Sequence, residues 1–346
     1  MTDDQGFGDL GINKNPNIIT PNIDQFASES VRFDNFFVSP VCAPTRASLM
    51  TGRYSLRTGI RDTYNGGAIM SNNETTIAEI LKEANYATGI FGKWHLGDNY
   101  PFRPSEQGFD ESLIHLAGGI GQVGDFTNYY KGNTSYFDPI LWKNNKQNQY
   151  KGYCSDIFAE NAIEFIEKNK NNSFFCYLSF NAPHTPLQVP EKYYNMYKDL
   201  DPELGFKGES LALKMSKKDK EDARRIYGMV TNIDDNVGKV LNKLTELGIE
   251  EDTIIIFMTD NGPQQFRYNS NMKGLKGTVY NGGTRVPFYI KYAGKFKNSK
   301  VINRMSAHID VLPTILELCN LNVPNDRKID GQSLVSLINS KTFNDR

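Results

Sequence analysis

Apolar and polar residues follow two different periods along this chain, one typical of helices and one typical of buried strands. Amphipathic segments with apolar residues three and four positions apart predict helices, and short continuous apolar runs predict strands in a covered sheet. The predicted helices are residues 22–31, 75–85, 155–168, 218–247 and 310–320, and the predicted strands are residues 87–92, 174–180 and 253–259. Because helices and strands alternate, we expect an α/β protein built around a sheet.

Two regions interrupt this pattern. Residues 98–150 and 186–217 are rich in Asn, Tyr, Lys and Gly and show little periodicity. We expect them to be loops that wall a pocket. No linker, repeat or low-complexity tract divides the chain, so residues 1–346 are expected to form one domain.

The composition narrows the class of partner. A hydrophobic content of 39% over 346 residues is enough for a large core, and the net charge of −1 gives no electrostatic support for binding nucleic acid or an anionic membrane. No apolar stretch is long enough to predict a membrane span. The four cysteines, Cys42, Cys154, Cys176 and Cys319, are too widely spaced to indicate a zinc site or a disulfide framework.

The segment with the most chemical content begins at Cys42 and reads Cys-Ala-Pro-Thr-Arg-Ala-Ser-Leu-Met-Thr-Gly-Arg. Pro44 suits the first turn of a helix, and Gly52 suits its end. Cys42 would then lie at a helix N terminus, where unpaired N–H groups favour an anion, with Arg46 on the same face. For a cysteine taken alone, a buried structural role is the simpler alternative.

Two groups of oxygen-bearing side chains indicate a cation site. Asp3 and Asp4 are adjacent, and Asp260 and Asn261 directly follow the predicted strand 253–259. Ligand-binding residues of an open α/β sheet gather at the carboxyl ends of its strands. Three carboxylates and one amide oxygen suit Ca²⁺ first and Mg²⁺ second. Taken alone, the Asp-Asn-Gly sequence is more often a turn.

Lysine and histidine side chains occur in three further motifs. Lys93 and His95, in Gly-Lys-Trp-His-Leu-Gly, are two residues apart and would face the same way in an extended segment. His184, in Asn-Ala-Pro-His-Thr-Pro, lies in a loop restrained by prolines and suits acid–base chemistry because histidine titrates near neutrality. Lys276 belongs to a glycine-rich block over residues 273–287, where a solvated loop lysine is the alternative.

Together these motifs resemble the signatures of the type I, formylglycine-dependent sulfatases of the alkaline phosphatase superfamily, and they occur in that family's order. The resemblance implies a mixed, mostly parallel central sheet sandwiched by helices. It also implies that a formylglycine-generating maturation enzyme oxidises Cys42 to formylglycine. In the family, the residues matching Asp3, Asp4, Asp260, Asn261 and Cys42 bind the divalent metal.

The resemblance further implies a reaction. The residues matching Cys42, Arg46, His95 and His184 are catalytic, and those matching Lys93 and Lys276 bind sulfate. One hydroxyl of the hydrated aldehyde attacks sulfur and forms a covalent sulfo-enzyme, while His184 protonates the departing alcohol. The other hydroxyl then passes its proton to His95 and sulfate is expelled.

The expected activity is therefore hydrolysis of a sulfuric ester, with a sulfated carbohydrate favoured over an aryl sulfate as substrate. Four aromatic residues of the first loop region offer faces that could stack on sugar rings, although aromatic residues in loops more often serve packing: Tyr129, Tyr130, Tyr136 and Trp142.

Two alternatives remain open. A phosphodiesterase or phosphonate hydrolase of the same superfamily would use a similar site, because the site suits any tetrahedral oxyanion. An inactive fragment that binds glycans is the other alternative, since the resemblance places a strand before Asp3 and an antiparallel C-terminal subdomain after residues 330–334. The chain is therefore expected to be truncated at both ends. It carries no signal peptide, and its full-length form is expected to be periplasmic or secreted.

Overall fold

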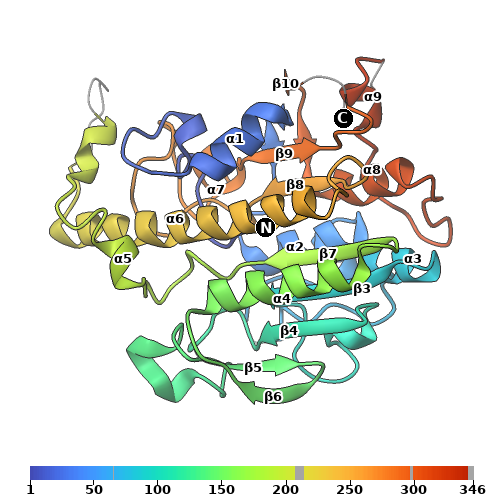
Figure 1. Ribbon diagram of the computed structural model, residues 1–346, viewed down its shortest axis with the longest axis horizontal. Coiled ribbons are helices and arrows are strands. Elements are labelled where there is room, and N and C mark those ends of the chain that lie inside the picture. Colours follow the sequence, from blue (N-terminus) through green and yellow to red (C-terminus); the bar gives the residue numbers. More distant parts are fainter. Residues whose placement is uncertain (65, 207–213, 297–298, 342–346) are drawn as a thin grey trace.

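The computed structural model describes residues 1–64, 66–206, 214–296 and 299–341, and all the predicted helices and strands are present (Figure 1). The main helices are α1 (Pro21–Glu29), α2 (Cys42–Thr51), α3 (Ile77–Glu83), α4 (Cys154–Asn169), α6 (Lys217–Glu246) and α8 (Val311–Leu318), with single turns at α5 (Glu191–Tyr194), α7 (Asn281–Thr284) and α9 (Val335–Ile338). The strands are β1 (Val31–Phe33), β2 (Phe36–Phe37), β3 (Ala87–Lys93), β4 (Glu111–His115), β5 (Ile140–Lys143), β6 (Lys146–Gln149), β7 (Phe174–Ser179), β8 (Ile255–Met258), β9 (Phe288–Lys291), β10 (Lys300–Ile302) and β11 (Ser306–Ala307).

The described strands form two principal sheets. One has the order β6-β5-β4-β3-β7, in which β3 pairs in parallel with both β4 and β7 while β5 and β6 are antiparallel. The other has the order β10-β1-β9-β8, in which β1 pairs in parallel with β10 and β9 is antiparallel to β1 and β8. The α/β class expected from the sequence is confirmed, with both directions of pairing present.

The first residues of the chain join the two sheets at the edges formed by β7 and β8. Met1 donates its N–H to the carbonyl of Leu178 (2.9 Å) and accepts from Phe180 (3.0 Å). Thr2 donates to the carbonyl of Met258 (3.1 Å) and bridges Thr259 in the parallel direction. The N terminus therefore lies in the middle of the molecule (Figure 1), where it directs the following residues out of the sheet edge.

Helices cover both faces of the sheets. On one face α1, α4 and α6 pack together, and α4 contacts β3 and β7. On the other face α2 packs against α3 and α8. Each face has its own apolar cluster: Phe26, Phe158 and Met229 belong to the first, and Phe33, Leu81 and Leu312 belong to the second. Burial of apolar side chains between the helices and the two sheets is the main favourable term in folding.

The prediction of an irregular loop over residues 98–150 is wrong in part, because this region contains β4, β5 and β6. Strand β4 is short and fully apolar only over residues 113–114, and β6 reads Lys-Gln-Asn-Gln with every residue exposed. Strand β6 lies at the edge of its sheet and β4 lies inside it, but both are held by pairing with their neighbours, and neither sequence shows a clear period. Residues 207–213, in the second predicted loop, lie outside the described residues.

None of the described helices combines the length and the apolar character that crossing a bilayer requires.

Candidate active site

The side chains predicted to act together converge at the edge of the sheets where β3, β7 and β8 end. Lys93 is the last residue of β3, the loop with His184 follows β7, and Asp260 follows β8. The close approach of β3 to β7 explains Gly92, because a Cβ at this position would lie 1.8 Å from the carbonyl oxygen of Ser179. Asp3 follows the residues that bridge the sheets, so it reaches the same edge.

Cys42 begins helix α2, as predicted, and Gly52 ends it with a φ of 67°. The Cys42 Sγ atom is buried and lies 3.3 Å from Nδ1 of His95. Nε2 of His95 lies 2.9 Å from the carbonyl oxygen of Thr63, and since a carbonyl oxygen only accepts, the Nε2 atom carries the ring proton. Nδ1 therefore presents a lone pair to the Cys42 side chain.

Burial and the nearby Lys93 hold the pKa of His95 well below its ordinary value, so the ring is neutral near pH 7. A neutral imidazole with its lone pair toward residue 42 is arranged as a base for a proton on that residue.

Three cations, two of them buried (Arg46 and Lys93) and one partly buried (Lys276), pair one-to-one with three buried carboxylates. The distances are 2.8 Å from Arg46 Nη2 to Asp260 Oδ2, 2.6 Å from Lys93 Nζ to Asp3 Oδ2, and 2.6 Å from Lys276 Nζ to Asp4 Oδ1. The formal charges of these six side chains cancel. A bound divalent cation would leave the cluster with an excess of positive charge, which favours binding of an anionic ester.

Three oxygen atoms of the expected metal ligands are buried and have no hydrogen-bond partner: Asp3 Oδ1, Asp4 Oδ2 and Asn261 Oδ1. Leaving one buried acceptor unpaired costs about 1–3 kcal/mol, so three together in one place call for a missing ligand. Ligand atoms of Asp3, Cys42 and Asp260 also lie within 4.8 Å of one another. An oxygen-rich donor set fits a hard cation such as Ca²⁺ or Mg²⁺.

The carboxylates of this cluster titrate differently from one another. Burial and the neighbouring Asp3 raise the pKa of Asp260 to about 6, although Arg46 opposes the shift. Burial also raises the pKa of Asp3, against the effect of Lys93. Burial disfavours ionisation of Asp4 as well, but Lys276, His184 and Lys93 together outweigh it and hold the pKa of Asp4 below its ordinary value. Asp4 is therefore the most firmly ionised of the three.

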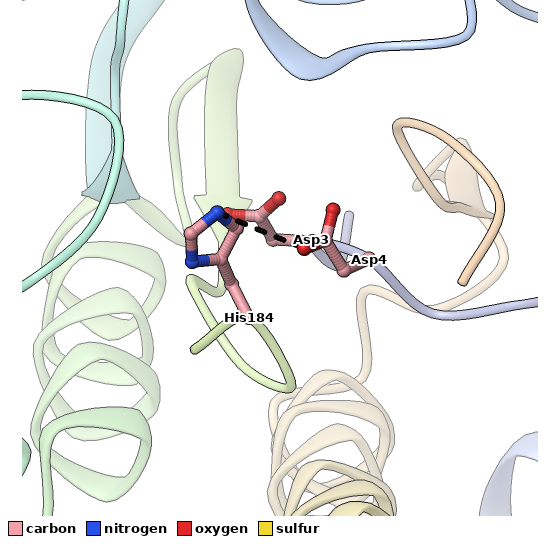
Figure 2. A group of neighbouring side chains, drawn as sticks. All are labelled: Asp3, Asp4 and His184. Atoms are coloured by element: carbon pink, nitrogen blue, oxygen red, sulfur yellow. Dashed lines mark ion pairs between the residues drawn. The ribbon is translucent and has the colours of Figure 1, made fainter. Parts of the chain in front are cut away.

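His184 lies beside Asp4, with its Nε2 atom 3.7 Å from Asp4 Oδ2 (Figure 2). Its Nδ1 atom lies 2.7 Å from the carbonyl oxygen of Thr185, so Nδ1 carries the proton and Nε2 is free to accept. Burial lowers the pKa of His184 to about 3, with Lys276 adding to the shift and Asp4 opposing it. Ligand atoms of His184, Asp3 and Asp4 are also close enough to share an ion, which the sequence did not suggest.

Arg46 does not face open space. Its Nη1 atom donates to Ser179 Oγ (2.6 Å) and to the carbonyl of Lys93 (3.1 Å), and its Nε and Nη2 atoms donate to Asp260. The predicted side chain is present beside Cys42, but its guanidinium is committed to holding Asp260 and the ends of β3 and β7. Ser179 was missed by the sequence analysis, because a serine at the end of an apolar strand carries no distinctive pattern.

Two of the aromatic residues expected to stack on sugars do not lie on the surface. Tyr136 is fully buried, and its hydroxyl donates to the carbonyls of His184 (2.6 Å) and Asn181 (3.2 Å). It supports the loop that carries His184 and offers no face to a ligand. Trp142 is half-buried in β5, whereas Tyr129 and Tyr130 are exposed as expected.

The fold is that of a sulfatase, and the chain belongs to the sulfatase family: the Sulfatase family model matches residues 1–321. The family expected from the motifs is thus confirmed. The mouse (Mus musculus) N-acetylgalactosamine-6-sulfatase is 31% identical over 97% of this chain, and the ulvan-active sulfatase of Formosa agariphila is 31% identical over 98% of it. The crystal structure of Ps i-CgsB in complex with k-i-k-neocarrahexaose superimposes with a TM-score of 0.84 and 31% identity, covering 99% of this chain and 75% of that one.

The chain spans 64% of the length of each of these two curated relatives.

Proposed function

We propose that this chain hydrolyses the sulfate ester of a sulfated carbohydrate, using formylglycine made from Cys42 and a bound divalent metal, with Ca²⁺ favoured. The arrangement that carries the proposal is the cluster of Arg46, Lys93 and Lys276 with three carboxylates beside the Cys42 Sγ atom. The relatives named above are a sulfatase of N-acetylgalactosamine, an ulvan-active sulfatase and a protein in complex with a neocarrahexaose, which supports a carbohydrate over a small aryl sulfate.

Asp3, Asp4 and Asn261 would hold the cation through their unpaired oxygens. Asp260 would complete the set, because a ligand atom of Asp260 lies within 4.8 Å of those of Asp3 and Cys42. The metal would polarise the sulfate group, and formylglycine would supply the hydroxyl that attacks sulfur. Lys93 and Lys276 supply fixed positive charge in a buried site, where it stabilises the charge that develops on the sulfate oxygens. Arg46 acts by holding Asp260 in place and ionised.

Two histidines, one acting as a base and one as an acid, carry the protons. His95 Nδ1 accepts the proton of a hydroxyl on residue 42. In the net reaction the bond between sulfur and the bridging oxygen breaks, the bridging oxygen leaves with the alcohol and takes a proton, and water supplies the fourth oxygen of sulfate. His184 is the acid for the alcohol: the negative charge of a bound ester raises the lowered pKa of His184, Nε2 takes up a proton from solvent, and that proton passes to the bridging oxygen.

The test is sulfate release by the chain co-expressed with a formylglycine-generating enzyme, with the aldehyde confirmed by peptide mass. The substrates are 6-sulfated N-acetylgalactosamine, carrageenan and ulvan oligosaccharides, an aryl sulfate and a phosphate diester. We expect release from at least one oligosaccharide, lost in Cys42→Ala and kept in the control Cys319→Ala.

The other outcomes separate the alternatives. Faster hydrolysis of the phosphate diester than of any sulfate ester would identify a phosphodiesterase of the same superfamily. Binding of a sulfated oligosaccharide without turnover, by a chain with a confirmed aldehyde, would identify a glycan-binding protein and refute the proposed activity.

A further inference from the structure

We propose that a buried ion pair between Arg267 and Asp9 positions Asp4 for metal binding. The proposal rests on the proposed function, because Asp4 is one of the expected metal ligands. Both side chains of the pair are fully buried, and Arg267 Nη2 lies 2.5 Å from Asp9 Oδ2. The Nε atom of Arg267 donates to Asp9 Oδ1 at 2.8 Å while Nη2 donates to Oδ2, so the contact is bidentate and sets the orientation of the guanidinium.

The same guanidinium also forms a hydrogen bond with the backbone of Asp4, the expected metal ligand. Its Nη2 atom also donates to the carbonyl oxygen of Asp4 at 2.9 Å, and its Nη1 atom donates to the carbonyl of Gln265 at 3.0 Å. On the other side, the N–H of Asp4 donates to Asp260 Oδ1 at 3.2 Å. Asp4 has a φ of 60°, a left-handed conformation that a non-glycine residue keeps only when its surroundings impose it. Arg267 and Asp260 supply that restraint.

The direction of the Asp4 side chain depends on this conformation. Its Oδ1 atom meets Lys276 Nζ (2.6 Å) and Asn261 Nδ2 (2.7 Å), which leaves Oδ2 buried and unpaired. If the Asp4 peptide turned, both oxygens would move and the unpaired one would leave the cluster. Arg267 itself contacts none of the other expected metal ligands by a side-chain bond, so its effect on the site passes through Asp4.

Two further contacts couple the halves of the ligand set. Asp9 Oδ2 accepts from the N–H of Gly6 at 2.7 Å, which closes the turn after Asp4. The N–H of Gly8 donates to Asn269 Oδ1 at 2.9 Å, and Asn269 donates to the carbonyl of Gly282 at 3.1 Å. The segment that follows Asp260 and Asn261 therefore holds the segment that follows Asp3 and Asp4 at two points, so the two halves are fixed relative to each other.

An arginine is required at residue 267 because one planar fork serves two acceptors in fixed directions. A lysine would keep the charge opposite Asp9 but has no second arm for the Asp4 carbonyl. Groups that orient metal ligands without touching the metal typically change affinity by about 10–100-fold when they are replaced. We therefore expect Arg267→Lys to fold and to bind Ca²⁺ at least about tenfold more weakly than the native chain.

The experiment measures Ca²⁺ binding by isothermal titration calorimetry and by the Ca²⁺-induced rise in melting temperature, so it needs no turnover. The variants are Arg267→Lys, Arg267→Met and the control Arg53→Met. The control removes a largely buried ion pair away from the site, in which Arg53 Nη1 lies 3.0 and 2.9 Å from the two carboxylate oxygens of Glu74. We expect both Arg267 variants to lose Ca²⁺ affinity, and the control to lose melting temperature while keeping the native affinity. If Arg267→Met does not fold, Arg267→Lys decides the question.

Each outcome has a separate meaning. Native Ca²⁺ affinity in a folded Arg267→Lys variant would overturn the positioning role, and so would an equal loss of affinity in Arg53→Met, which would point to general loosening of the fold. A native chain that binds neither Ca²⁺ nor Mg²⁺ would instead refute the metal site of the proposed function, and the positioning role with it.

Discussion

Replacing Arg46 with methionine should destabilise the fold by about 3–5 kcal/mol, the usual cost of removing one partner of a buried ion pair. The Arg46 side chain is 1% exposed and Asp260 is fully buried, so water cannot replace the lost cation. The change also removes the bond to Ser179 Oγ at 2.6 Å and the bond to the Lys93 carbonyl at 3.1 Å. At roughly 2 °C per kcal/mol for a chain of this size, the melting temperature should fall by about 6–10 °C.

The loss should be smaller at pH 5 than at pH 7. The pKa of Asp260 is already raised to about 6 by burial and by Asp3 while Arg46 is present, so it rises further without Arg46. Near pH 6 the native state of the variant then binds a proton that the unfolded chain, with an ordinary Asp pKa of about 3.9, does not. Since the native state binds more protons, its stability increases as the pH falls through the raised pKa.

Thermal unfolding followed by circular dichroism at pH 7 and pH 5 measures both effects. Arg46→Lys keeps a positive charge and should lose less than Arg46→Met. The double variant Arg46→Met with Asp260→Asn should recover part of the loss, because it no longer buries an unpaired charge. A melting temperature for Arg46→Met within about 2 °C of the native value at pH 7, or an equal loss at both pH values, would refute the electrostatic explanation.

Three further predictions concern the metal site and the approach of the strands. Ca²⁺ at 100 times its dissociation constant should stabilise the chain by about 2.7 kcal/mol and so raise its melting temperature. Asn261→Leu removes one unpaired oxygen and should make this Ca²⁺-induced rise smaller. Calorimetry should show that the Ca²⁺ affinity falls by up to about tenfold per pH unit below pH 6. The reason is that Asp260, with its pKa of about 6, must lose its proton before it can bind the ion. A pH-independent affinity would contradict this. Gly92→Ala should unfold the site region or abolish soluble expression, because the added Cβ would lie 1.8 Å from the Ser179 carbonyl oxygen. A native melting curve for this variant would be evidence against the observed strand spacing.

Much of the architecture followed from local pattern alone. The helix at Cys42–Thr51 was predicted from Pro44 and from Gly52, which does adopt the left-handed conformation that ends it. The long amphipathic helix and the apolar strands were also predicted, because burial on one face imposes a period on the sequence. The edge strand β6 was not, because its residues are all exposed and exposure imposes no apolar period, and its neighbour β5 is too short, at four residues, to show one.

The sequence alone also determined which residue types meet at the site. Each group of site residues occurs in a contiguous motif of a few residues. These motifs are the carboxylates after β8 and near the chain start, the lysines in glycine-rich segments, and the helix that begins at Cys42. The function of such motifs can be predicted from the sequence because each motif is local. Neighbouring residues on one turn or at one strand end face the same pocket.

Only the tertiary structure decided how those groups are paired. It committed Arg46 to Asp260 and Ser179, left one oxygen each of Asp3 and Asp4 without a partner, and brought Arg267 onto the Asp4 carbonyl from more than 250 positions away in the chain. It also buried Tyr136 beneath the His184 loop, where composition had suggested an exposed ring. A motif specifies which groups a segment carries, whereas partners, burial and protonation depend on contacts between distant segments, and these exist only once the chain has folded.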